Sequence, residues 1–336
     1  MNVVYTFDNG YAEITAVSML SLLRNNMNCK DLNLYVADCG ITLENQNKLN
    51  DLAKKFGRVI NYVDARNMEF RIPISLNLSY WTFTCYVRLF FSELFPTLDR
   101  VMHIDCDTIV CGSLEEAYNT NIEEAYCAGC YDCIPSTKRQ AGLQKEDIYV
   151  SNGFLIFDLD KMRKDNIQEK FVNYIVEKKG NLPHLDQDVV NAVLKHRIYI
   201  MPAKYNVMTY NVLFKSRCCE FFDKDEPYYS NKEINDAVKD PKVVHLVGYR
   251  FVSKPWMQPC YHPYNALWKS YYSECKFCGD GKLLKYKRKK YGILREIVCI
   301  VWNLGRRIPG IDYLEFIWEK RRVFLKCENA IHCKEN

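Results

Sequence analysis

Two carboxylates stand two positions apart in the chain, at Asp105 and Asp107. The stretch that holds them, Val101–Val110, is otherwise rich in apolar residues. Residues i and i+2 of a strand point to the same face, and both carboxylates can still reach one point if the strand end unwinds here. Mg²⁺ is usually held by one or two carboxylates together with substrate phosphates. The stretch therefore predicts a site for a metal ion and a diphosphate, and a surface turn that carries two acids is the plainer alternative.

Three basic residues elsewhere could complete such a site. His245 lies near the end of an apolar run, and its neutral imidazole as a third ligand would favour Mn²⁺ over Mg²⁺. Lys254 could neutralise phosphate charge, and Arg88 offers a rigid fork of donors that suits a diphosphate. His245 and Arg88 each have an ordinary alternative, because a histidine at a strand end often serves structure and an arginine among aromatic residues often reaches the surface.

Strand-like and helical stretches alternate along the first third of the chain, and this pattern predicts right-handed crossovers and a mostly parallel sheet. The strand-like runs are Asn2–Phe7, Leu32–Ala37, Val59–Val63 and Val101–Val110, the last preceded by an aromatic-rich helix over residues 80–94. Ligands of such sheets bind beyond the carboxyl ends of the strands. The acids at these expected ends are Asp8, Asp38, Asp64 and Asp105.

The second half of the chain continues with similar elements. Strands are expected over residues 125–133 and 149–159, and an amphipathic helix over 164–178. Asp186 is expected to cap a helix that contains Val189 and Val190, or else to lie beside a reacting sugar.

Composition and charge describe an ordinary globular chain with a basic end. The 336 residues are 48% hydrophobic and carry a net charge of +5. Residues 282–336 hold 14 Lys and Arg against 6 Asp and Glu, so the rest of the chain carries a net charge of −3. Two helical patterns, near 293–302 and over Tyr313–Leu325, combine basic, aliphatic and aromatic residues. Such helices bind anionic membrane surfaces, and a helical pair packed on the domain is the alternative.

The 16 cysteines are expected to be reduced thiols, because no export signal and no apolar run of spanning length is evident. We therefore expect a cytoplasmic protein, or one peripheral on the inner face of the cytoplasmic membrane. Within the expected strand 125–133, Cys127 and Cys130 should lie on opposite faces. Zinc binding by Cys260, His262, Cys275 and Cys278 is an open alternative to simple packing.

The order of these motifs resembles glycosyltransferase family 8, especially the bacterial enzymes that extend lipopolysaccharide or capsule glycans. The resemblance runs from Val3 to about Trp268. His103–Asp107 is similar to the metal motif of the family, with His103 where tyrosine is usual. The other matching segments are Val4–Tyr11, Arg88, Ser151–Phe154, Leu185–Asp188, His245 with Gly248, and Lys254–Trp256.

The resemblance implies a GT-A fold, an α/β architecture with a Rossmann-like, mixed and mostly parallel sheet flanked by helices. Residues 1–275 would form the catalytic domain and residues 276–336 a basic, amphipathic helical appendage. The implied reaction is retaining transfer of a hexose from UDP-glucose or UDP-galactose to an oligosaccharide or glycolipid acceptor, with no nucleic-acid partner. Mn²⁺, with Mg²⁺ as the alternative, would be held by Asp105, Asp107 and His245.

The resemblance also assigns a set of donor-binding residues. They are Thr6, Phe7, Asp8, Tyr11, Arg88, Ser151, Asn152, Gly153, Asp186, Gln187, Gly248 and Lys254. Two departures from the family pattern matter. Gly248 and Lys254 are separated by five residues, more than is usual, which leaves the path of their loop open. Ser151 stands where asparagine is typical and Asn152 follows it, so either side chain could contact the sugar.

Retention of configuration has two possible routes. A double displacement needs a nucleophile, for which Asp188 and the amide oxygen of Gln187 are the candidates. Attack on the same face needs none, because the leaving diphosphate oxygen takes the acceptor proton, and we favour this route. A sugar nucleotidyltransferase would need a Gly-rich basic loop after the first strand, which Phe7–Gly10 lacks. A non-catalytic binding protein is disfavoured by the intact set of metal ligands.

Overall fold

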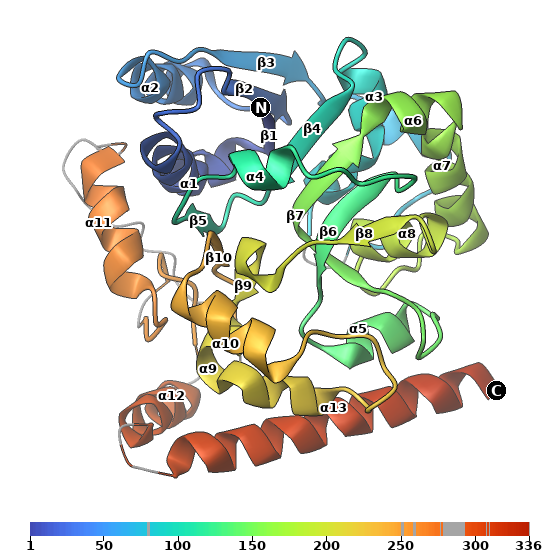
Figure 1. Cartoon of the computed structure of the whole chain (residues 1–336), viewed down its shortest axis with the longest axis vertical. Helices are drawn as coiled ribbons and strands as arrows, with labels where there is room; N and C mark the ends of the chain where they lie inside the picture. The colour runs from blue at the N-terminus through green and yellow to red at the C-terminus, as the bar shows by residue number, and fades with distance from the viewer. Residues whose placement is uncertain are drawn as a thin grey trace.

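A seven-stranded sheet forms the centre of the protein (Figure 1). The computed structural model describes residues 1–78, 81–249, 252–257, 260–275, 277, 293–306, 308 and 310–335. In sheet order the strands are β3 (Ile60–Asp64), β2 (Asn33–Asp38), β1 (Asn2–Phe7), β4 (Arg100–Ile104), β7 (Val150–Asp158), β6 (Cys127–Tyr131) and β8 (Ile198–Ile200). Only β7 runs antiparallel to its neighbours in this order. The predicted mixed, mostly parallel sheet is therefore confirmed.

The prediction of one continuous strand over residues 101–110 is wrong. The chain leaves the large sheet after β4, turns at Asp105–Asp107, and enters a second sheet as β5 (Thr108–Val110). The turn is held by a hydrogen bond from the Asp105 amide to the Gly153 carbonyl (3.0 Å) and by one from Thr108 Oγ1 to the Asp105 carbonyl (2.8 Å). The two carboxylates therefore project from a junction between two sheets.

The second sheet brings a distant segment to this junction. Its order is β5, β10 (Val243–His245) and β9 (Val207–Met208). The antiparallel register of β10 against β5 places His245 opposite Thr108, the residue directly after Asp107. Strand pairing thus accounts for the approach of an imidazole to two carboxylates more than 100 residues earlier in the chain.

Helices cover both faces of the large sheet. One face packs against α1 (Ala12–Asn25) and α2 (Leu43–Lys54), and the other against α3 (Phe91–Leu94), α6 (Leu159–Lys164), α7 (Ile167–Glu177) and α8 (Asp186–Val193). Cys130 belongs to the first apolar layer and Cys127 to the second, so their predicted separation onto opposite faces is confirmed.

Two helix predictions need correction. The expected helix over 80–94 is mainly the 3₁₀ helix η3 (Phe83–Phe90), which continues into α3. Asp186 does not cap α8, because Leu185, with φ of 53°, stands at the cap position and makes no side-chain cap. The Asp186 carboxylate faces the interior instead.

The remaining elements are η1 (Asn9–Tyr11), η2 (Met68–Arg71), α4 (Glu115–Tyr118), α5 (Pro135–Gln140), η4 (Ala203–Tyr205), α9 (Thr209–Phe214), η5 (Lys215–Phe221), α10 (Asn231–Lys239) and α11 (Asn265–Cys275).

The C-terminal helices are α12 (Ile293–Gly305) and α13 (Ile311–Glu335), the second longer than predicted. Figure 1 shows α13 lying beneath α9 and α5. Phe316 is buried against the rings of Phe214 (5.9 Å) and Phe221 (5.6 Å), so α13 is packed against α9 and η5. No helix among the described residues has the length and apolar character needed to cross a membrane.

This packing predicts unequal effects of two neighbouring substitutions in α13. Phe316→Ala should lower the free energy of unfolding by about 3–5 kcal/mol, because it removes a fully buried ring. Ile317→Ala, at a position that is 44% exposed, should change it by less than about 0.5 kcal/mol. Urea denaturation of both variants measures the difference, and equal destabilisation would contradict the packing of α13 described here.

Candidate active site

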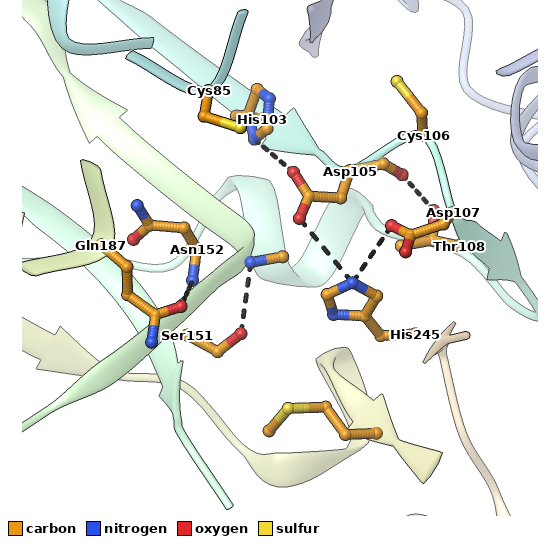
Figure 2. A network of polar contacts seen from close by, with 12 residues as sticks. Cys85, His103, Asp105, Cys106, Asp107, Thr108, Ser151, Asn152, Gln187 and His245 are labelled. Carbon is orange, nitrogen blue, oxygen red and sulfur yellow. Dashed lines mark hydrogen bonds and ion pairs between the residues drawn. The ribbon is translucent and has the colours of Figure 1, made fainter. Parts of the chain in front are cut away.

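Asp105, Asp107 and His245 converge at the junction between the two sheets (Figure 2). His245 Nε2 lies 3.1 Å from Asp107 Oδ1 and 3.7 Å from Asp105 Oδ2. One ligand atom from each residue lies within 4.8 Å of the other two, and among the described residues no other such group of three potential ligands occurs. Two carboxylates and an imidazole are a donor set that suits Mn²⁺, so these residues fit the implied metal.

Charge neutralisation shapes the ionisation of this group. Burial alone would lower the pKa of His245, but the carboxylates of Asp107 and Asp105 outweigh it and raise that pKa above its usual value. For Asp107, burial alone would raise the pKa, but the charges of Lys254 and His245 hold that pKa well below its usual range. The Lys254 ammonium lies 2.5 Å from Asp107 Oδ2. Asp107 is therefore an anion in a site that already supplies positive charge.

Gly153 allows the His245 ring to lie where it does. A Cβ atom at position 153 would stand 2.2 Å from His245 Nδ1 and 2.4 Å from its Cε1, well inside van der Waals contact. The amide oxygen of Asn206, a buried residue that the sequence did not indicate, would lie 3.2 Å from the same point. Glycine is thus needed at position 153 of the Ser151–Phe154 motif because the ring of His245, a candidate metal ligand, lies too close for a side chain there.

Arg88 links this group to the next part of the site. Its guanidinium is buried and donates to Asp105 Oδ1 (3.0 Å) and to the Asn152 carbonyl (2.6 Å), and its Nε lies 3.1 Å from Asp186 Oδ2. The alternative that Arg88 is a surface residue is therefore wrong. Its charge holds the β4–β5 turn, β7 and the start of α8 together.

His103, whose role the sequence left unexplained, contacts the guanidinium of Arg88. Its Nδ1 accepts from Arg88 at 3.4 Å, and its ring packs against Phe91 at 5.6 Å. Burial and the positive charge of Arg88 lower the pKa of His103 well below its usual value, so the imidazole is neutral. The 3.9 Å contact of His103 with Asp105 drawn in Figure 2 is too long for a hydrogen bond.

A second polar network extends from Arg88 through Asn152. The Asn152 amide group donates to Asp186 Oδ2 (2.5 Å), and the Asn152 backbone donates to Gln187 Oε1 (3.1 Å). Gln187 in turn donates to Asp132 Oδ2 (2.9 Å). Burial raises the pKa of Asp186 to about 6, although Arg88 opposes the shift. Asp132 was missed in the sequence, although it lies at the end of an expected strand, where ligands of such sheets bind.

Ser151 and Asp188 lie beside this network but make separate contacts. Ser151 Oγ accepts from the Gly153 amide at 3.4 Å, whereas Asn152 is the member of the pair that reaches Asp186. Asp188 is fully buried, and its two oxygens accept from the Tyr149 hydroxyl (2.6 Å) and the His184 amide (2.8 Å). Both oxygens of Asp188 therefore have strong structural partners.

Cys106 connects the end of β1 to the group formed by Asp105, Asp107 and His245. Its thiol is buried and lies 3.5 Å from the Thr6 carbonyl, so it points into the fold. Phe7 has a buried side chain and can offer a ligand only its backbone. Asp8 accepts from the Gly10 amide (2.9 Å) and caps η1, whereas the side chain of Tyr11 is 37% exposed.

The loop between Gly248 and Lys254 turns back on itself. Tyr249 and Val252 form an isolated antiparallel bridge, and a Cβ at Gly248 would lie 3.9 Å from the Lys254 side chain. The longer spacing in the sequence is therefore taken up by the turn, and the two donor-binding candidates remain neighbours.

The suggested zinc residues do not gather within the described part of the chain. His262 Nε2 lies 2.9 Å from Thr209 Oγ1, and the Cys275 thiol donates to the Ala16 carbonyl at 3.3 Å. Cys278 lies outside the described residues. The one group of three potential metal ligands among the described residues is Asp105, Asp107 and His245.

Comparison with known proteins agrees with this geometry. The model of the family described as Glycosyl transferase family 8 matches residues 2–260. A putative glycosyltransferase of Haemophilus influenzae is 27% identical over 268 residues, which are 78% of this chain and 74% of that protein. The lipopolysaccharide 1,2-glucosyltransferase of Escherichia coli is 30% identical over 264 residues, which are 76% of this chain and 73% of that protein.

The fold matches a solved structure as well. The crystal structure of the galactosyltransferase LgtC in complex with donor and acceptor sugar analogues aligns with a TM-score of 0.70 at 21% identity. The alignment covers 82% of this chain and 96% of that one. The expected GT-A architecture is therefore confirmed.

The contact between Gly153 and His245 predicts a metal-binding defect. Gly153→Ala should weaken Mn²⁺ binding by about 10- to 100-fold in the absence of nucleotide, because the new methyl group must displace a ligand ring. Electron paramagnetic resonance of free Mn²⁺ measures the affinity. Gly305→Ala is the control, since its Cβ would meet no atom closer than 3.7 Å. Wild-type affinity in the Gly153 variant would refute the role of close approach.

Proposed function

This chain belongs to glycosyltransferase family 8, and we propose that it transfers glucose or galactose from a UDP-sugar to an envelope glycan or glycolipid with retention of anomeric configuration. One observation carries the proposal, namely the convergence of Asp105, Asp107 and His245 beside a cluster of polar side chains at strand ends. The relatives support the choice of sugars, since one is a glucosyltransferase and the structural neighbour a galactosyltransferase.

The diphosphate would lie against the metal ligands and Lys254. Bound Mn²⁺, or Mg²⁺ as the alternative, would act as a Lewis acid that stabilises the charge developing on the leaving UDP. Lys254 and the Gly248 backbone would donate hydrogen bonds to the same phosphate oxygens. Asp8 and Tyr11 would hold the ribose and the uracil, with the exposed Tyr11 ring stacked on the base.

The donor sugar would lie against the Arg88 network. Asp186, Asn152 and Gln187 offer acceptors and donors for sugar hydroxyls, and the buried Oδ1 of Asn152 has no hydrogen-bond partner among the described residues. Ser151 would add a hydroxyl at the edge of this group. Arg88 would keep Asp105 and Asp186 in place through its charge.

Attack on the same face is the route that the geometry favours. The acceptor oxygen would form a bond to the anomeric carbon as the bond to the diphosphate breaks, and the acceptor proton would pass to the leaving oxygen. A nucleophilic Asp188 would have to attack with an oxygen that already accepts a buried hydrogen bond, since each of its two oxygens has one. The Gln187 amide oxygen already accepts from the Asn152 backbone, so it is better suited to orient the sugar than to attack it.

A comparison of two acids at strand ends tests the proposed function. Asp107→Asn should lower Mn²⁺-dependent turnover of UDP-glucose or UDP-galactose by at least about 100-fold, since it removes a charged ligand. Asp64→Asn, at the exposed end of β3, should leave turnover within about twofold. Release of UDP from both donors is the measurement. No turnover of either sugar by the wild-type protein, or equal turnover by the two variants, would refute the proposal.

We further propose that α12 holds the protein on the anionic inner face of the cytoplasmic membrane. Its exposed apolar residues recur with helical spacing and are Ile297, Val298, Val301 and Leu304. Residues 282–290, which precede α12 in the sequence, include six Lys and Arg. An apolar helix face together with basic residues is the combination that binds anionic lipid.

Vesicle binding tests this surface without disturbing α13. The double variant Val301→Ser with Leu304→Ser should bind phosphatidylglycerol vesicles at least about 10-fold more weakly, because two apolar side chains no longer enter the lipid interface. The double variant Met27→Ser with Val59→Ser changes two apolar residues elsewhere that are more exposed than Val301 and Leu304, and it is the control. Sedimentation measures binding, and equal affinity of both variants would exclude the proposed contact.

A further inference from the structure

The turn between Gly248 and Lys254 is fixed by a residue that points away from the site. The Tyr249 amide donates to the Val252 carbonyl (3.0 Å), and the Val252 amide donates back to the Tyr249 carbonyl (2.9 Å). Tyr249 itself is 6% exposed, although it lies in a surface loop. The position of Lys254 therefore depends on where the Tyr249 side chain is anchored.

The anchor is built from the C-terminal half of the chain. The Tyr249 ring stands edge-on to Tyr210 (5.1 Å) and Phe214 (5.9 Å) of α9. The Arg306 guanidinium, directly after α12, lies 5.9 Å from the same ring. The Tyr249 hydroxyl donates to Glu319 Oε2 of α13 at 3.4 Å. Tyr249, which follows the donor-binding candidate Gly248, is thus surrounded by side chains from α9, from α13 and from the residue directly after α12.

Glu319 of α13 is unusual because it is a charged residue on the buried face of the helix. Its side chain is fully buried, and a buried carboxylate is stable only with charge and hydrogen-bond partners. Arg322 supplies the charge, with Nε 2.9 and 3.0 Å from its two oxygens, and the Tyr210 hydroxyl donates to it at 3.1 Å. One buried carboxylate therefore receives hydrogen bonds from α9, α13 and the Gly248–Lys254 loop.

We propose that Glu319 and Tyr249 form a clamp that makes α13 a positioning element for the donor-diphosphate loop. The clamp holds the turn that places Lys254 beside Asp107. Tyr249 and Glu319 are positioning residues, since they act on the donor through the loop. The inference rests on the proposed role of Lys254 toward the diphosphate. It assigns the C-terminal helices a part in donor binding that is separate from any contact with a membrane.

The variant Tyr249→Phe removes one hydroxyl and keeps the ring. UDP binding in saturating Mn²⁺ should weaken by about 3- to 10-fold, as expected for one lost hydrogen bond that positions the loop. The Michaelis constant for the UDP-sugar should rise by a similar factor with little change in kcat. Mn²⁺ affinity without nucleotide should stay at the wild-type value, since no metal ligand is altered. Hydrogen exchange of the amides over residues 246–249 and 252–254 should become faster.

The control is Lys320→Gln, which removes the exposed ion pair between α13 and Glu220 and should change none of these quantities. A fall in melting temperature alone, with UDP affinity and loop exchange unchanged in Tyr249→Phe, would show a merely structural role and overturn the clamp. Failure of the wild-type protein to bind UDP would refute the proposed function instead. Loop exchange needs no nucleotide, so it tests the clamp in that case as well.

Discussion

A charge buried inside a protein has to be neutralised there, and the structure meets this requirement for Arg88 by assembling the site around it. Its guanidinium contacts Asp105 from the turn after β4, Asp186 from α8 and the Asn152 carbonyl from β7. Three segments that are distant in the sequence are fixed relative to one another by this one group. Asp105 gives one oxygen to Arg88 and keeps the other beside His245, so the same carboxylate connects the polar network of Asn152 and Asp186 to the candidate metal site.

The sequence predicted the parts of this arrangement that depend on local pattern. Short apolar runs predicted the strands β1, β2 and β3. Acids at the ends of expected strands predicted the carboxylates of the candidate site. The sequence left open whether the strand unwinds at Asp105–Asp107, because apolar residues stand on both sides of these acids and the break is set by pairing with β10. For Asp186 the local pattern left two interpretations open, a helix cap or a place beside a reacting sugar, and the structure excludes the cap.

His103 and Glu319 show a second limit of prediction from sequence. A histidine before the metal motif and a glutamate on a basic helix both have ordinary surface interpretations. Each is buried in the structure, His103 as a neutral acceptor for Arg88 and Glu319 as the acceptor for two tyrosines and Arg322. Their roles depend on partners far away in the chain, and no local pattern signals them. The C-terminal helices are accordingly joined to the body by specific polar contacts as well as by the apolar packing of Phe316.

We propose that Asp105, Asp107 and His245 bind the metal ion that holds the diphosphate of a UDP-sugar. Crystals of the full-length protein soaked with Mn²⁺ and UDP, measured on both sides of the manganese absorption edge, would show whether they do. We expect a single anomalous peak in contact with the two carboxylates and His245 Nε2, with the UDP diphosphate on its other side. Ordered UDP bound at a distance from these three side chains, or manganese bound elsewhere in the protein, would contradict it.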